Sequence, residues 1–556
     1  MSWKPFGGED YWDFDAVSAW CQAMVAAHPG WVRLEEVGKS RHGRPMMLLT
    51  FGRQDGHTEE RPAFWLDAGT HAAEWTGVMS ALYTMSRWIE GVEDGSLSDW
   101  FSSHTCYVMP CVSPDGFQAM HDGLPFLRST LRPPRPGTVR SGMSPSDIDG
   151  DGEIRWMRWR HPAGPWIPDA TCPIMMRPRT VDDDSADAFF VCTEGELIAW
   201  DGVKWIAASR EFGLDLNRNF PVDWKPFSMF GMDSGDFPGS EPESQAILRA
   251  FADRPNIASA VTNHTYTGCL LAPPASDDSP LPDSDIAMMS RLAHDAVEGT
   301  DYKVYKVYPE FMYDPKKPTI GTWDDTMSCT FGVAGYTLEL WDPYRWAGLT
   351  DVAPLDMFRN PDMKVIRAIL DKCIAEGLYE PWTPFDHPQL GAVEIGGIDY
   401  MHTVRNPPTP LLPKECERGF AVADRVRRAV PSVSATLEVT ALSKQITQVR
   451  LVLENLGALP TSGLAIGESL GVSPSVSASL VVADGTELLE GPAEKALHHL
   501  DGWLSGLSGF GRNPIYPSLA GRGHRAVVTW LVRGSGSVTV RWIAGRGGVG
   551  EASAEI

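Results

Sequence analysis

The sequence predicts an α/β fold followed by a C-terminal antiparallel β-sandwich, and three features of its pattern lead to this prediction. Near-continuous apolar runs, typical of strands buried on both faces of a mixed or parallel sheet, recur along the first part of the chain. These runs span residues 46–52, 63–69, 104–112, 257–265 and 333–341. Helical patterns lie between them at 75–90, 241–254, 285–296 and 361–376. From about Val433 the pattern changes to short alternating strands divided by Gly, Ser and Pro, which is typical of a sandwich.

These patterns divide the chain of 556 residues into two domains. We expect an α/β layered domain over 8–405 and an accessory β-sandwich over 430–556, joined by a Pro-rich linker at 405–415. Residues 120–212 interrupt the α/β rhythm and are rich in Pro, Arg, Asp and Trp. We interpret them as a long insertion on one face of the core, and a loop of that length is usually functional. The tail from Gly545 is expected to fray.

The charge and the cysteines disfavour some classes of partner. The formal net charge is −24, which disfavours nucleic acid and anionic membranes as partners. The sequence shows no apolar run long enough for a membrane span and no signal-peptide pattern. The nine cysteines are scattered and form no C-x-x-C pair, which indicates reduced thiols and a cytoplasmic location. The sequence does not define an oligomeric state.

A candidate metal site begins at the end of the strand expected over 63–69. His71 and Glu74 lie three residues apart at the start of a predicted helix. Alone, this pair also fits a helix start with an acid near its positive end. His264 ends the apolar run over 257–265 and is the candidate third ligand, although a histidine there can also be a hydrogen-bonded structural residue. Two imidazoles and one carboxylate leave a fourth position for water, which is the arrangement of a catalytic zinc ion.

Glu339 and an Asn-Arg pair are candidates for the chemistry around such an ion. Glu339 lies in the apolar segment "GYTLELWD", where a buried carboxylate is costly unless it has a partner or a function. It is either a general base or a strand-end acid paired with an arginine. Asn217 and Arg218, in "GLDLNRNF", can grip a terminal carboxylate in a bidentate manner.

Three arginines among tryptophans, in "IRWMRWR", are candidates for stabilising a developing oxyanion. They are Arg155, Arg158 and Arg160. Each can instead have a surface or stacking role, and the residues alone do not decide between these roles.

Taken together, these motifs resemble the zinc carboxypeptidase family, which has the fold of carboxypeptidases A and B. The resemblance covers about residues 8–385 and rests on the opening "DFDAVSAWCQAMVAAHPGWVRLEEVGKSRHGRPMMLLTFG", "SPDGF", "DLNRNF" and "YTLELWD". It implies a mixed, mostly parallel eight-stranded sheet with helices on both faces, and one catalytic zinc ion. It also implies roles for six residues: zinc ligands at His71, Glu74 and His264, a carboxylate clamp at Asn217 and Arg218, and the general base at Glu339.

The resemblance further implies an oxyanion arginine and a tyrosine that caps the substrate. For the oxyanion we choose Arg158, because it follows an apolar-aromatic stretch at the corresponding place, with Arg155 and Arg160 as rivals. For the capping residue we choose Tyr313, although its spacing to the catalytic strand is a few residues too long. Ala73 stands where the family often has an arginine next to the zinc glutamate.

Asp324 is the candidate for substrate preference. Counted back from Glu339, it falls at the floor of the pocket for the terminal side chain, where an Asp resembles the carboxypeptidase B type that prefers Lys or Arg. Alternatively, this acid pairs with Lys316 or Lys317, or Asp325 occupies the position.

The acid-rich stretch "DIDGDGEIRWMR" is a candidate calcium loop. Asp147, Asp149 and Asp151 alternate ahead of Gly152, as in the front half of an EF-hand loop. Arg158 stands where such a loop has its bidentate Glu, so an acid-rich turn without an ion is the alternative.

The sequence therefore predicts a zinc-dependent metallocarboxypeptidase that acts on peptides with a free C-terminal carboxylate, with a preference for basic terminal residues if Asp324 lines the pocket. One alternative keeps the same residues in an amidase or a γ-D-glutamyl peptidase that acts on acyl-amino acids or muropeptides. A binding protein that kept the fold without activity is a third hypothesis, disfavoured because ligands, base and clamp are all present.

Overall fold

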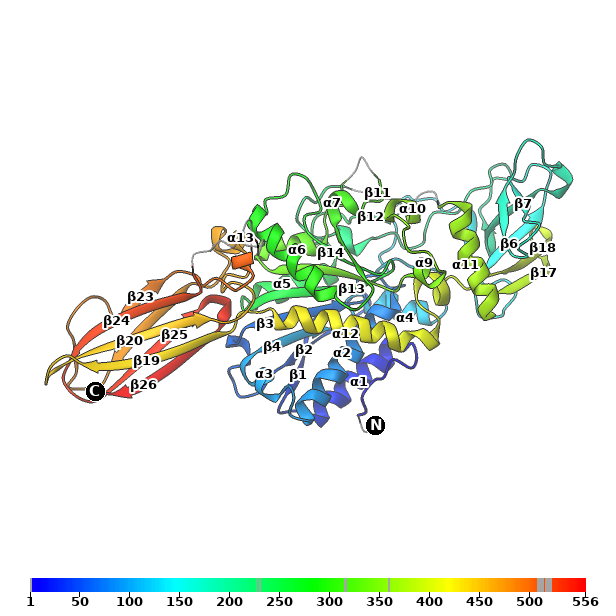
Figure 1. Cartoon of the computed structure of the whole chain (residues 1–556). Helices are drawn as coiled ribbons and strands as arrows, with labels where there is room; N and C mark the ends of the chain where they lie inside the picture. Colours follow the sequence, from blue (N-terminus) through cyan, green and yellow to red (C-terminus); the bar gives the residue numbers. More distant parts are fainter. Residues whose placement is uncertain are drawn as a thin grey trace.

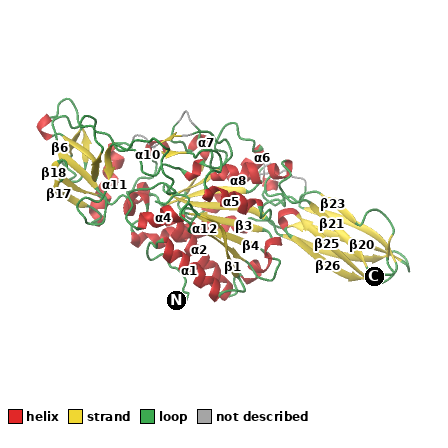
Figure 2. Cartoon of the chain, turned by 180° about the vertical axis from the view of Figure 1, so that it is seen from behind, coloured by secondary structure: helices red, strands yellow, loops and turns green. Residues whose placement is uncertain are grey.

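The computed structural model describes residues 3–226, 228–229, 232–314, 318–358, 361–507, 515 and 523–556. Three bodies lie in a row: a central α/β body, a β-sandwich at one end and a smaller β-sheet module at the other (Figure 1). The N-terminus lies on the central body and the C-terminus on the sandwich in both views (Figures 1 and 2). In the described part of the chain, no helix is both long and apolar enough to cross a membrane.

The central body is built on a mixed sheet, which within the described residues has eight strands in the order β1-β2-β4-β3-β13-β16-β14-β15. The strands are β1 (Val32–Lys39), β2 (Pro45–Phe51), β3 (Ala63–Ala68), β4 (Thr105–Met109), β13 (Ile257–Thr265), β14 (Cys269–Ala272), β15 (Lys303–Lys306) and β16 (Ala334–Leu340). β3 runs parallel to β4 and β13, β13 to β16, and β14 to β15, whereas the other three pairs are antiparallel. Every residue of β3, β4, β13 and β16 is buried, which explains their apolar runs. The predicted sheet is confirmed.

Helices cover both faces of this sheet. The long helices of the chain are α1 (Phe14–Ala27), α2 (Trp75–Glu93), α5 (Pro242–Ala252), α6 (Asp283–Val297), α8 (Trp323–Phe331), α11 (Met363–Glu376) and α12 (Leu412–Arg428), of which α11 packs against α9 and, within the described residues, not on the sheet. The short ones are α3 (Ser98–Ser103), α4 (Pro114–His121), α7 (Val307–Glu310), α9 (Pro343–Trp346) and α10 (Pro354–Phe358). Phe64 and Leu66 of β3 pack in one core with α1, α2, α6 and α12, and Trp65 packs in a second core with α5 and α8. Alternate residues of β3 therefore point into opposite cores.

Helix α12 corrects the expected linker. The linker prediction over 405–415 is wrong in its second half, because α12 begins at Leu412 and packs on the central body. Cys416, Val422 and Val426 are fully buried in the core that holds α2. Glu415 accepts a hydrogen bond from the Trp341 backbone N–H at 3.1 Å, which joins α12 to the end of β16. The α/β body therefore extends beyond residue 405.

The insertion over 120–212 forms sheets of its own. Its strands are β5 (Gly142–Pro145), β6 (Trp156–Arg160), β7 (Trp166–Pro168), β8 (Met176–Pro178), β9 (Phe189–Thr193) and β10 (Gly195–Ile198). Strands β17 (Glu380–His387) and β18 (Gly391–Gly397) complete a six-stranded sheet in the order β17-β18-β6-β9-β7-β8, while β5 pairs with β10. A further hairpin joins β11 (Ser228–Met229) to β12 (Met232–Asp233). Two segments far apart in sequence thus build one module (Figure 1).

The C-terminal body is the predicted antiparallel sandwich. Its strands are β19 (Val433–Ala441), β20 (Ile446–Asn455), β21 (Val476–Val482), β22 (Glu487–Leu488), β23 (Glu494–Leu497), β24 (Arg525–Arg533), β25 (Ser537–Ala544) and β26 (Val549–Glu555), with helix α13 (Ala465–Ser469) between β20 and β21. They form sheets in the orders β19-β20-β24-β22 and β23-β21-β25-β26. The expectation of a frayed tail from Gly545 is wrong, because β26 pairs with β25 and Arg546 is buried, donating to Ser462 O at 3.0 Å.

Candidate active site

Three buried side chains converge at the carboxyl ends of the central strands. His71 and Glu74 follow β3, and His264 lies next to the end of β13, the parallel neighbour of β3. Glu74 Oε1 lies 2.9 Å from His71 Nδ1, and Glu74 Oε2 lies 2.8 Å from His264 Nδ1. The two Nδ1 atoms are 3.0 Å apart, and each residue is at most 2% exposed. The structure thus brings the three predicted ligands together, because the carboxyl ends of parallel strands meet at one edge of a sheet.

This donor set fits a zinc ion. Two imidazoles and one carboxylate are the ligands of catalytic zinc sites that keep one position open. Asp215 orients the ring of His71, because Asp215 Oδ1 lies 3.1 Å from His71 Nε2. The Nδ1 atom of the same ring then faces the other two ligands. Sequence reasoning missed Asp215. Burial alone would raise the pKa of Asp215, but Arg128, Arg218 and His71 outweigh it and hold this pKa well below its usual value.

Glu339 lies beside the zinc-ligand trio on β16. The parallel register of β13 and β16 places Glu339 opposite His264, and the carboxylate is on the cavity wall with 9% of the residue exposed. Burial, together with the negative charge of Glu74, raises the pKa of Glu339 to about 7. Within the described chain, no ion pair to this carboxylate is seen, which disfavours the alternative of a structural acid. A carboxylate with this pKa can take up and release a proton near neutral pH.

Arg128 lies beside the zinc-ligand trio. Its Nη1 donates to Glu74 Oε1 at 2.9 Å, and its Nε lies 3.5 Å from Asp215 Oδ2. The Arg128 carbonyl accepts a hydrogen bond from the Ala72 N–H at 2.8 Å, so this segment runs directly alongside His71. Arg128 is therefore positioned to donate to a developing oxyanion at the trio.

The prediction that Arg158 stabilises the oxyanion is wrong. Arg158 lies on β6 in the separate module, where its Nε donates to Glu394 at 2.7 Å and its guanidinium stacks on Trp382 at 4.2 Å. The rivals are also engaged elsewhere: Arg155 contacts Glu153 at 3.4 Å on the outer cavity wall, and Arg160 contacts Asp187 at 3.3 Å. The insertion carries the tryptophan-rich segment away from the zinc-ligand trio.

The residues of the predicted carboxylate clamp follow Asp215 directly in the chain. Asn217 and Arg218 belong to the 3₁₀ turn η3 (Leu216–Arg218). Asn217 Oδ1 accepts a hydrogen bond from the Trp323 N–H at 2.8 Å, which leaves the Nδ2 group as its donor. Arg218 and Tyr313 both line the cavity, with the guanidinium 5.9 Å from the centre of the tyrosine ring. Arg218 and Tyr313 thus meet in the cavity, whereas Asn217 is buried and is not among the described residues that line it. The roles of all three stay predictions.

Asp324 lies behind the cavity wall. It is 2% exposed, and its Oδ2 accepts from Thr337 Oγ1 on β16 at 3.3 Å while its Oδ1 accepts from the Asp325 N–H at 2.9 Å. It is not among the described residues that line the cavity. The alternative partners Lys316 and Lys317 lie outside the described residues.

The acid-rich turn provides its own partners. Asp147 accepts hydrogen bonds from the Gly150 and Gly152 N–H groups at 2.7 and 2.9 Å. Asp149 and Asp151 are exposed or nearly so, and one carboxylate oxygen of each of the three acids lies within 4.8 Å of the others. These hydrogen bonds form an acid-rich turn, which the sequence allows as the alternative to a calcium loop. Calcium binding at this turn stays a prediction.

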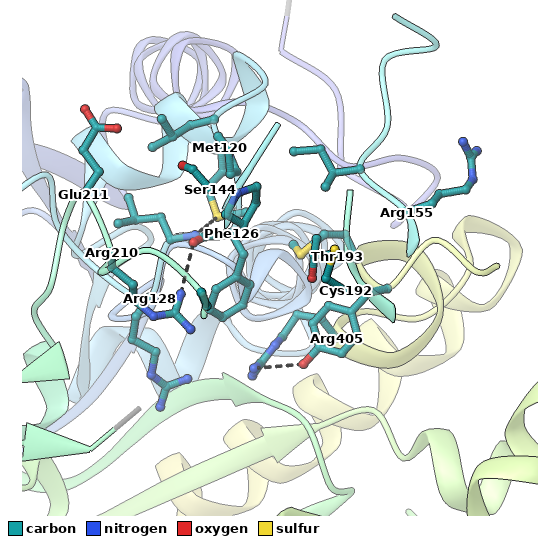
Figure 3. Close-up of a pocket in the computed structure, with 18 of the residues that line it drawn as sticks. Met120, Phe126, Arg128, Ser144, Arg155, Cys192, Thr193, Arg210, Glu211 and Arg405 are labelled. Carbon is teal, nitrogen blue, oxygen red and sulfur yellow. Dashed lines mark hydrogen bonds between the residues drawn. The ribbon is translucent and has the colours of Figure 1, made fainter. Parts of the chain in front are cut away.

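A cavity of about 1290 Å³ opens over the zinc-ligand trio. Its inner wall includes Glu74, Glu339, Arg128, Arg218 and Tyr313, and its outer wall comes from the insertion and from the segment 398–405. Arg128, Arg210 and Arg405 point into it from different segments of the chain (Figure 3). A second ionisable group on the outer wall consists of Glu153, Asp399 and His402, in which Asp399 holds the His402 ring.

Comparison with known proteins identifies the class to which this fold and site belong. The zinc carboxypeptidase family model matches residues 17–173 and 175–371, so the chain belongs to this family of metallopeptidases. Carboxypeptidase A1 from Rattus norvegicus is 23% identical over 357 residues, which cover 62% of this chain and 65% of that protein. Carboxypeptidase B from Astacus astacus is 31% identical over 107 residues, which cover 19% of this chain and 34% of that protein. The chain thus spans less than two thirds of the length of these relatives.

Similarity also extends to solved structures and to the sandwich. The crystal structure of thrombin activatable fibrinolysis inhibitor matches 76% of this chain and 77% of its own, with a TM-score of 0.45 and 15% identity. The sandwich matches, over residues 433–555, a family described only as a domain of unknown function.

Proposed function

We propose that this chain is a zinc metallocarboxypeptidase that hydrolyses the C-terminal peptide bond of peptides. The observation that carries the proposal is the convergence of His71, Glu74 and His264 in one cavity with Glu339 and Arg128. Bound zinc would polarise the scissile carbonyl and lower the pKa of the attacking water.

The side chains of the cavity divide the remaining work. Glu339 accepts the proton of the attacking water and then delivers it to the leaving amine, so that water is added across the C–N bond. Arg128 donates to the carbonyl oxygen as negative charge develops on it. Arg218 and Asn217 Nδ2 bind the free carboxylate of the terminal residue. Tyr313, whose ring centre lies 5.9 Å from the Arg218 guanidinium, caps the terminal residue of the substrate.

The test is release of the terminal residue from N-blocked dipeptides ending in Arg, Lys, Phe, Leu, Glu or D-Ala. Zinc-loaded protein is expected to release at least one of these residues, and the Glu339→Gln variant is the blank. A zinc-loaded wild-type protein that releases none of them would contradict the proposal.

A preference for Lys or Arg is the finer part of this proposal and rests on Asp324. Support comes from its bond to Thr337, two residues before Glu339 on the same strand, which places the acid just behind the wall. An Asp324→Ala variant is expected to process Arg and Leu substrates with kcat/KM values within about twofold of each other, because the charge that discriminates them is gone. The Asp325→Asn variant is the matched control and is expected to keep the wild-type profile. An unchanged profile in Asp324→Ala would show that Asp324 does not set the preference.

A second candidate function is favoured by two guanidinium groups on the cavity wall. An amidase or γ-D-glutamyl peptidase would use the same residues on acyl-amino acids or muropeptides. The guanidinium groups of Arg210 and Arg405 on the wall suit a free carboxylate beside the scissile bond, which a γ-linked glutamyl residue carries. Release from a γ-glutamyl substrate without release from α-linked dipeptides would favour this function.

Calcium binding by Asp147, Asp149 and Asp151 is tested by titration. If the loop binds calcium, the ion raises the melting temperature, and the Asp147→Asn and Asp149→Asn double variant abolishes the rise, because a bound ion stabilises the folded state by mass action. A melting temperature that is unchanged by a chelator and by millimolar calcium would leave an acid-rich turn only.

A cytoplasmic location also stays a prediction, supported by nine cysteines that are all free thiols.

A further inference from the structure

Arg405 reaches the zinc-ligand trio from outside the family-matched region. It ends the π-helical turn η4 (Met401–Arg405), more than thirty residues beyond the last matched residue, 371. Its Nη1 lies 3.3 Å from Glu74 Oε1 and donates to Thr265 O at 3.1 Å, and its Nη2 lies 3.3 Å from the Tyr400 hydroxyl. The side chain is only 12% exposed. A connecting segment therefore contributes a buried cation to the cavity.

The surroundings hold this guanidinium in place. It lies 5.0 Å from the centre of the Tyr266 ring and 5.4 Å from that of Phe126. The next residue, Asn406, donates to Ala73 O at 3.0 Å and accepts from the Thr76 N–H at 3.0 Å, which ties the segment to the start of α2. A cation fixed in this way needs little reorganisation to bind a ligand.

Three guanidinium groups lie close to Phe126 on this wall. Arg210 lies 5.2 Å from the centre of the Phe126 ring, so this ring contacts two arginines, and Arg128 follows two residues later. Among the described residues, the one carboxylate within ion-pair distance of Arg405 is Glu74, which also contacts Arg128 and both histidines. Arg405 Nε is buried and, in the same described part, has no hydrogen-bond partner. A protein of net charge −24 thus concentrates positive charge at this wall.

The position of this wall determines which part of a substrate it meets. On the proposed function, Arg218 and Asn217 bind the carboxylate of the leaving residue beside Tyr313. The acyl part of the substrate must then extend into the rest of the cavity, past Phe126 and Tyr400, which line it. Arg405 shares Glu74 with Arg128 and both histidines, and a desolvated cation is stabilised by a further negative charge, so the favourable ligand there is an anion.

We propose that Arg405, with Arg210, forms an anion subsite that selects substrates with a carboxylate on the acyl side of the scissile bond. Arg405 is the specificity-determining residue of this subsite, and the inference rests on the proposed function. Two sources supply the same chemistry: the side chain of a penultimate Glu or Asp, and the free α-carboxylate of a γ-linked glutamyl residue.

The test compares three acetylated substrates that share one terminal residue, chosen as the best in the dipeptide panel. They carry α-linked Glu, α-linked Gln or γ-linked Glu on the acyl side. With the full-length zinc-loaded protein, one of the Glu substrates is expected to exceed the Gln substrate about tenfold or more in kcat/KM, because a charge-assisted bidentate pair discriminates by at least that factor. Preference for the α-linked substrate identifies the side chain as the anion, and preference for the γ-linked one identifies the α-carboxylate.

The variants assign the preference to Arg405. Arg405→Gln is expected to reduce the ratio of kcat/KM between the Glu and Gln substrates to within about threefold, mainly through a higher KM for the Glu substrate. Arg405→Lys is expected to retain part of the preference, since it keeps the charge but not the bidentate geometry. Arg140→Gln is the matched control, because Arg140 lines the same cavity and lies 3.4 Å from Glu211. It removes one positive charge and is expected to keep the preference.

Equal kcat/KM for the Glu and Gln substrates in the wild-type protein would overturn the subsite, even if Arg405→Gln failed to fold. An equal loss on all substrates in a folded Arg405→Gln variant would also overturn it, since that result indicates a structural role. Release from every substrate without discrimination leaves the proposed function standing, whereas release from none overturns both.

Discussion

The Glu339→Gln variant is expected to lose about 10²- to 10⁴-fold in kcat, the range that a general acid-base group contributes. The substitution keeps the shape of the side chain and removes its ability to accept a proton. Because Glu339 is not one of the three zinc ligands, the zinc content and KM are expected to stay close to those of the wild-type protein. Steady-state kinetics on the preferred dipeptide, with zinc measured by mass spectrometry, checks both expectations.

Glu394→Gln is the matched control for this variant. Glu394 contacts Arg158 in the separate β-sheet module and makes no contact with the zinc-ligand trio within the described residues. Its rate is expected to stay within about twofold of the wild-type rate, as for a substitution remote from the site. A Glu339→Gln variant that keeps more than a tenth of the wild-type kcat would show that another group moves the proton.

The Arg128→Met variant is expected to lose about 10²- to 10³-fold in kcat, as on removal of one oxyanion-hole donor. The reason is its place beside the zinc-ligand trio, where its Nη1 lies 2.9 Å from Glu74 Oε1. The effect should fall mainly on kcat, because the charge that Arg128 stabilises develops only in the transition state. The measurement is kcat and KM on one dipeptide, with the zinc content determined on the same samples.

Arg158→Met is the control that separates the two candidate arginines. It removes the same positive charge from β6, where Arg158 pairs with Glu394 of β18. The kcat of this variant is expected to be unchanged. A larger loss in Arg158→Met than in Arg128→Met would contradict the assignment. Loss of zinc from the Arg128→Met protein would mean that this arginine supports the ligand Glu74 and not the oxyanion.

The residues predicted correctly as neighbours are those whose position follows from local pattern. His71, His264 and Glu339 each stand at the end of an apolar run, and the ends of parallel strands meet at one edge of a sheet. The sequence grouped these residues by their donor chemistry and by the resemblance to the zinc carboxypeptidase family. Their convergence in space follows from strands that are both parallel and adjacent, as β3, β13 and β16 are.

Arg128 and Asp215 were missed although the sequence held a signal for each. Arg128 ends the apolar run "LPFLR" shortly after the "SPDGF" turn, and Asp215 stands two residues before Asn217 in the motif already identified. Arg158 instead follows an apolar-aromatic stretch, but that stretch packs the inserted module, where Arg158 stacks on Trp382.

Arg405 could not be predicted, because its contact with Glu74 joins residues 331 positions apart. The Pro-rich sequence around Arg405 is typical of a linker. No residue pattern near Arg405 indicates that the chain turns back into the cavity. The helix after it was open to prediction: Cys416, Val422 and Val426 form an apolar stripe consistent with the helical period, and they are the residues that α12 buries.

Carboxypeptidase activity is tested with one blocked peptide in two forms, a free C-terminal acid and the corresponding C-terminal amide. Products from zinc-loaded protein are identified by mass. A carboxypeptidase is expected to release one residue from the acid and to act at least about a hundredfold more slowly on the amide, because the amide lacks the carboxylate that Arg218 and Asn217 bind. Equal cleavage of both forms, or cleavage at an internal bond, would contradict this activity.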